Sequence, residues 1–170
     1  MPVGTSWKDC LLTETPPQAD VRQSMLLMQA SQFRCALATT DVVEVMRPLP
    51  VSPMPGVPAF VSGVAVIRGL SVPVVDMGML LGAAAPAAAG RWVVLRLGER
   101  RVALAVEAVR GVVRLDGSML ASAPPLLRDA RAEFIETMGV MDQQLYLTLN
   151  SGRILGDEVW LALATQAASS

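Results

Sequence analysis

Few side chains in this 170-residue chain could carry out chemistry, and their types limit the possible reactions. The sequence holds two cysteines, Cys10 and Cys35, and no histidine. Without histidine no Ser-His or Cys-His pair forms, imidazole metal ligands are absent, and the commonest general base is missing. Lys8 and Arg34 are the basic residues near the two thiols. Because the neighbours of Cys35 are apolar, we expect a buried, inert thiol there rather than a nucleophile.

Composition narrows the possible partners. A net charge of -1 and a pI near 5.4 give no basic field, so nucleic acid is not an expected partner. The hydrophobic share is 52% and the charged share 17%, which indicates a large core or an apolar surface reserved for partners. The opening residues lack a signal-peptide pattern, and Gly and Pro interrupt the longest uncharged run, 77–90. We therefore expect a cytoplasmic protein with reduced thiols, no direct membrane insertion and no cofactor.

Two blocks of the sequence repeat in the same order. Residues 34–47 and 101–114 share the pattern R-x-A-L-A-x-x-x-V-x-x-V-x-R without a gap. Residues 63–82 then align with 137–156, and this places Asp76 on Asn150. Both residues offer a side-chain oxygen that caps a following helix, so the match has a physical basis. The repeat predicts a duplicated structural unit of about sixty residues.

Turn signals divide each unit into short strands. Residues 24–29 and 33–37 predict one hairpin, and 63–67 and 71–75 predict a second whose Arg68-Gly69 turn uses Gly69 at positive φ. Residues 92–97 and 101–106 repeat the first hairpin, and a closing hairpin is expected around 142–144.

Other segments predict helices and connections. Asp41 precedes Val42–Met46 with Glu44 three residues on, a spacing that predicts a capped short helix. Five prolines between 48 and 58 predict an extended edge or a rigid loop, and 83–90 reads as a linker. Short duplicated strands indicate a mainly β fold of two small barrels with an apolar interface. We assign 24–82 to the first barrel, 91–156 to the second and 157–170 to a terminal helix.

The string VVEVMRPLPVSPMPGVPAFVSGVAVIRGLSVPVVDMGMLLG, residues 42–82, resembles the CheW family of chemosensory coupling proteins. The family shows a V-x-E-V-x-R segment, a Pro-rich loop, G-V-x-N-L-R-G and V-I-P-V-V-D-L in that order. The resemblance resumes over Trp92–Val113 and covers about 25–155. It implies a single domain of two SH3-like five-stranded β-barrels and a non-enzymatic adapter. The implied partners are a CheA-type histidine kinase and the cytoplasmic tip of methyl-accepting chemoreceptors, in chemotaxis or a related pathway, with recruitment to membrane receptor arrays.

Residues that match the family's receptor-facing groove are the expected binding site. These are Val42, Glu44, Gly63, Arg68, Ala103, Val109 and Val112. We expect Glu44 and Arg68 to form an ion pair that fixes this surface, although such residues are also commonly solvated, and each aliphatic residue could equally be core. The Pro-rich loop around 53–60 and the hairpin ends are candidates for kinase contact. Two alternatives remain, a ligand-sensing β-barrel and a cysteine-dependent enzyme.

Overall fold

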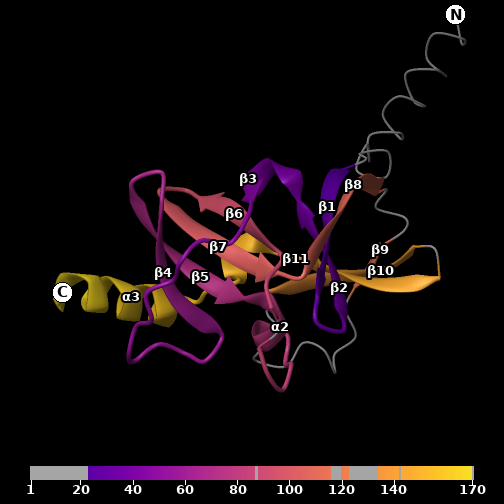
Figure 1. Ribbon diagram of the computed structural model, residues 1–170. Coiled ribbons are helices and arrows are strands. Elements are labelled where there is room, and N and C mark those ends of the chain that lie inside the picture. Colours follow the sequence, from indigo (N-terminus) through magenta and orange to yellow (C-terminus); the bar gives the residue numbers. More distant parts are fainter. Residues whose placement is uncertain (1–22, 87, 116–119, 123–133, 142, 170) are drawn as a thin grey trace, which may run out of the picture.

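The computed structural model describes residues 23–86, 88–115, 120–122, 134–141 and 143–169. Strands dominate it, and helices are short apart from the last one (Figure 1). The strands are β1 (Gln23–Ala30), β2 (Phe33–Ala38), β3 (Val42–Met46), β4 (Val61–Ile67), β5 (Leu70–Asp76), β6 (Arg91–Leu97), β7 (Arg100–Val106), β8 (Ala108–Leu115), β9 (Leu120–Ser122), β10 (Ile135–Met141) and β11 (Gln144–Leu149). The helices are η2 (Thr39–Asp41), α2 (Met77–Leu80), η6 (Ser151–Arg153) and α3 (Asp157–Ser169).

The strands form two sheets that lie beside each other (Figure 1). Sheet A has the order β8-β1-β2-β11-β10-β9, and sheet B has the order β3-β6-β7-β5-β4. The short β9 is the one strand of sheet A without an equivalent in sheet B. The mainly β fold class expected from the sequence is confirmed.

The two sheets do not coincide with the contiguous ranges 24–82 and 91–156, and this corrects the expected barrel boundaries. The opening hairpin β1–β2 pairs with β8 and β11 from the second repeat. The matching hairpin β6–β7 pairs with β3 and β5 from the first repeat. Each sheet therefore combines a hairpin from one repeat with strands of the other, four in sheet A and three in sheet B. The repeat marks equivalent strands, but it carries no information about which copy they pair with.

The duplication extends to the strand register. In sheet A, Thr148 lies opposite Ala36 and Leu149 opposite Leu37. In sheet B, Val74 lies opposite Ala103 and Val75 opposite Leu104. Bulges also recur at matching positions, between Val61 and Gly63 in β4 and between Ile135 and Thr137 in β10. The expected equivalence of residues 36–37 with 103–104, and of 76 with 150, is confirmed.

Both caps predicted from the repeat are present. The Asp76 carboxylate accepts a hydrogen bond from Met79 N at 3.1 Å and starts α2. Asn150 Oδ1 accepts one from Gly152 N at 3.1 Å and starts η6. The backbone N–H groups of the two capping residues are also bonded in the same way. Asp76 N donates to Phe60 O, and Asn150 N donates to Phe134 O.

The helix predicted over Val42–Met46 is wrong, because this segment is strand β3 at the edge of sheet B. Asp41 ends the 3-10 turn η2 and accepts a hydrogen bond from Ser151 Oγ at 2.5 Å. Three valines in five residues favour a strand, and pairing with β6 outweighs the local capping pattern.

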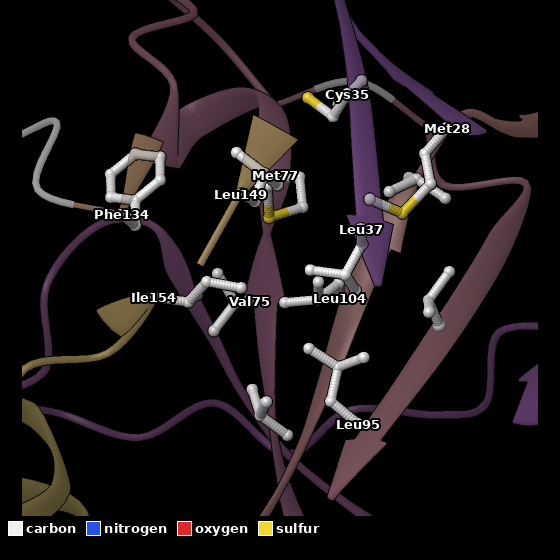
Figure 2. Close-up of a cluster of buried hydrophobic side chains, with 14 of the residues drawn as sticks. Met28, Cys35, Leu37, Val75, Met77, Leu95, Leu104, Phe134, Leu149 and Ile154 are labelled. Carbon is white, nitrogen blue, oxygen red and sulfur yellow. The ribbon is translucent and has the colours of Figure 1, made fainter. Parts of the chain in front are cut away.

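Three apolar clusters fill the molecule. The largest lies between the sheets and takes residues from both, and Figure 2 shows Leu37 of β2 near Val75 of β5 and Leu104 of β7. A second cluster, with side chains such as Trp92 and Val74, fills the interior of the barrel that sheet B forms. The third fills the interior of the barrel that sheet A forms. Strands of both hairpins are apolar on both faces because one face meets the shared cluster and the other meets the interior of its own sheet.

The terminal helix α3 confirms the expected helix that begins at 157. Its Leu163 joins the shared cluster, and the Arg100 guanidinium lies 5.0 Å from the Trp160 ring centroid. In the described part of the chain, no helix is long and apolar enough to cross a membrane. The Pro-rich stretch is a loop with one bridge, Ser52 to Val64. Cys10 and Asp142 lie outside the described residues.

Candidate functional site

Glu44 and Arg68 form the expected ion pair. Arg68 Nη2 donates to Glu44 Oε2 at 2.7 Å, and Arg68 Nε donates to the same oxygen at 2.9 Å. The Arg68 side chain is 70% exposed and that of Glu44 21%. These hydrogen bonds lower the pKa of the Glu44 carboxyl and raise that of Arg68, so both groups stay charged. Among the described residues this is the one ion pair.

The turn that carries Arg68 explains its position. Strands β4 and β5 are joined by two residues, and both have positive φ, 51° at Arg68 and 81° at Gly69. Two positive φ values are the mark of a type I′ hairpin turn, in which Asn or Gly is preferred at the first position. Arginine is an unfavourable choice there, since a side chain in the left-handed region costs conformational energy. The geometry of the turn therefore does not account for an arginine at this position.

The pair also closes sheet B across its two edges. Glu44 belongs to β3, and Arg68 is the first turn residue after β4. These two strands are the first and last of the sheet. Beyond the pair, Ser52 and Val64 exchange backbone hydrogen bonds of 2.8 and 2.9 Å. The first contact joins the edge strand β3 to the turn after β4, and the second joins the loop that follows β3 to β4 itself. Together they close the rolled sheet, as a small barrel requires.

Three of the expected site residues lie in one row across sheet B. The register runs from Glu44 to Val94, Ala103, Val74 and Gly63, one residue from each strand. Sequence spacing alone did not predict this row. It connects the two edges of the sheet and ends under the Pro-rich loop.

Gly63 and Ala103 are buried within this row. Ala103 is 0% exposed and packs inside sheet B, so its side chain meets no partner. Gly63 has φ 145°, and a Cβ built on it would run into Ser52 O and lie 2.8 Å from Val51 Cγ1. Glycine here lets the loop approach β4 closely enough to pair. Both residues support the surface from beneath.

The three site valines differ in exposure. Val42 and Val109 occupy equivalent places on edge strands β3 and β8, opposite Leu95 and Met28, and both are half-buried against the shared cluster. Val112 is 59% exposed. The structure thus brings Glu44 and Arg68 into contact, while Val109 and Val112 belong to sheet A.

Cys35 is fully buried in the shared cluster. Burial raises the pKa of its thiol to about 12, because a thiolate would lose its hydration there. A thiol that is neither accessible nor ionised is not a nucleophile.

Two arginines near Glu44 were not singled out from the sequence. Arg96 and Arg101 lie directly opposite each other on β6 and β7. The two-residue turn at 98–99 fixes that register, so the turn length in the sequence was enough to predict that the two arginines lie opposite each other. The charge of Arg101 also lowers the pKa of Glu44. Within the described ranges, no group of three His, Cys, Asp or Glu side chains could hold a metal ion.

The architecture is shared with a protein of known structure. The crystal structure of the scaffolding protein TtCheW from Thermoanaerobacter tengcongensis superposes with a TM-score of 0.72 at 19% sequence identity, covering 82% of this chain and 96% of that one. The fold is therefore the pair of SH3-like barrels seen in that protein.

The sequence comparison identifies the family. The CheW-like domain family matches residues 24–159, so this chain belongs to that family. Among curated proteins, the chemotaxis protein CheW of Rhizobium meliloti (strain 1021) is 33% identical over 87 residues, which are 50% of this chain. The match spans 56% of the relative's own length.

Proposed function

We propose that this protein is a non-enzymatic adapter that couples the cytoplasmic tip of methyl-accepting chemoreceptors to a CheA-type histidine kinase. Membership of the CheW-like family supports the proposal, as do the similarity to a chemotaxis protein and the fold shared with a scaffolding protein. The Glu44–Arg68 ion pair is the observation that supports the proposal most. It places an arginine on an exposed turn, although a type I′ turn favours Asn or Gly at that position. We expect the protein at receptor arrays.

The receptor-facing surface in this proposal has two layers. Glu44 and Arg68 contact the receptor together with exposed Val112, and half-buried Val42 and Val109 line the apolar part. Gly63 and Ala103 act from beneath by fixing the loop and the row that carries Glu44. A receptor helix with an apolar face suits such a surface, because aliphatic side chains give area and edge charges give register.

The two alternatives have less support. Cys35, the cysteine within the described residues, is buried with a raised pKa, which opposes a thiol enzyme. A ligand-sensing barrel needs polar groups that converge on a cavity. Apolar side chains from every strand of sheet B, with Met46 from the edge strand β3, fill the interior of this barrel instead.

Charge reversal at the pair tests the proposed surface. In vesicles that contain receptor and kinase, Arg68→Glu should lower adapter-dependent kinase activity roughly tenfold, because a lost charged hydrogen bond is worth about 1.5–3 kcal/mol. The double variant Glu44→Arg, Arg68→Glu should recover only part of it. The swap restores opposite charges, but the new arginine faces Arg101.

Thermal unfolding of the same variants is the control. The Arg68 side chain is 70% exposed, so Arg68→Glu should leave a cooperative transition close to that of the wild type. Full kinase activity with Arg68→Glu would remove Arg68 from the site. A loss of stability by several kcal/mol would instead make it part of the framework.

A further inference from the structure

One end of sheet B gathers four charged residues, Glu44, Arg68, Arg96 and Arg101, which we call the charged end. The start of β3, the end of β4, the end of β6 and the start of β7 meet there, because β3–β6, β6–β7 and β4–β5 are antiparallel pairs and β5–β7 is a parallel pair. Because side chains alternate along strands, Arg96 and Arg101 lie on the same face as Val94 and Ala103, which fill the interior of sheet B. The arginines therefore cap the open end of that apolar interior.

The charges at this end do not balance. Glu44 is neutralised by Arg68, and no further ion pair forms here among the described residues. Glu99, in the turn between β6 and β7, is exposed and does not pair with either arginine. Arg96 Nε donates to the backbone oxygen of Gly98 at 3.2 Å, a bond that leaves its charge uncompensated. Like charges directly opposite on neighbouring strands destabilise a sheet.

The duplication supplies an internal comparison. The residues that match Arg96 and Arg101 in sheet A are Gln29 and Arg34, which are also direct cross-strand partners. There Gln29 Oε1 accepts a hydrogen bond from Arg110 Nη2 at 2.5 Å. The position of Glu44 is taken by Gly111. The fold therefore does not require two opposed arginines, since the same register is built with one arginine and one amide.

We propose that Arg96 and Arg101 bind carboxylates of an acidic segment on the protein partner that docks beside the Glu44–Arg68 pair. Arginine is suited to this because its planar guanidinium makes two parallel hydrogen bonds to a carboxylate. Leu70 begins β5 at the same end and is 48% exposed, so it offers apolar contact next to the charges. The inference rests on the proposed function, because it specifies the chemistry of the receptor segment at that site.

Binding of a purified receptor signalling-tip fragment at several salt concentrations tests this. Arg96→Gln recreates the glutamine–arginine pair found at the matching position in sheet A, and Arg101→Gln instead removes the charge of Arg101. Each should weaken binding roughly tenfold and flatten its salt dependence. The melting temperature should rise by about 1–4 °C, because the opposed charges are relieved. The matched control is Arg91→Gln, an exposed arginine at the other end of β6, which should bind within about twofold of wild type.

The outcomes separate the two proposals. Unchanged binding by both glutamine variants, with wild type bound, overturns this inference and leaves the adapter role intact. No binding by wild type overturns the adapter role itself. A marked fall in melting temperature would make the arginines part of the framework. The last measurement is binding to phosphatidylglycerol vesicles that contain no receptor. If the variants lose only vesicle binding, the charged end recognises lipid rather than an acidic segment.

Discussion

A chain cut within the linker 83–90 is expected to remain a folded complex of its two pieces, and neither piece alone is expected to fold. Sheet A takes its hairpin β1–β2 from the first repeat, and sheet B takes its hairpin β6–β7 from the second, so each half alone lacks the inner hairpin of one sheet and the strands that flank the hairpin of the other. The shared cluster also draws on both halves. Loss of these contacts exceeds the roughly 5–15 kcal/mol that stabilises a domain.

A protease site inserted into the linker provides the measurement. After cleavage, gel filtration should give one species that contains both pieces and retains the circular dichroism of the uncut chain. Each piece purified alone should lack a cooperative thermal transition. A first piece that unfolds cooperatively without the second would contradict the exchange of hairpins between the sheets.

Gly63→Ala is expected to destabilise the protein by roughly 3 kcal/mol or more. The new methyl group would meet the Ser52 backbone, which cannot move without breaking its bridge to Val64. The positive φ of 145° adds conformational strain. Chemical denaturation monitored by tryptophan fluorescence should show this loss.

Gly69→Ala is the matched control for that variant. Its φ is also positive, 81°, but a Cβ there would meet nothing within 4 Å. Only the conformational cost of about 1–2 kcal/mol should remain. If Gly63→Ala kept wild-type stability and lost receptor coupling, Gly63 would belong to the contact surface rather than to its support.

The repeat predicted more of this fold than any single segment did. It placed Asp76 and Asn150 at matching caps and gave the equivalence of residues 36–37 with 103–104. It did not predict the exchange of hairpins. Local patterns fix a hairpin, whereas the choice of the sheet that the hairpin joins depends on contacts far apart in the sequence.

The candidate site was likewise predicted only in part. The Glu44–Arg68 pair, 24 residues apart, was expected because the resemblance to the CheW family placed both residues on one receptor-facing surface. The helix expected around Glu44 was wrong, since pairing of β3 with β6 decides that segment. Burial of Ala103 and Gly63 could not be predicted, because burial depends on the strands on either side and on the loop above. The opposition of Arg96 and Arg101 could have been predicted from the sequence, because it depends only on the exact length of the turn between β6 and β7.

The central claim is that the protein links receptor and kinase without chemistry of its own. Co-sedimentation with receptor-containing vesicles tests it most directly, with purified kinase, protein, or both added. The kinase is expected to sediment well above background only when the protein is present, and Arg68→Glu is expected to reduce this sedimentation. Equal sedimentation of kinase with and without the protein, or failure of the protein to sediment with the receptor, would contradict the account.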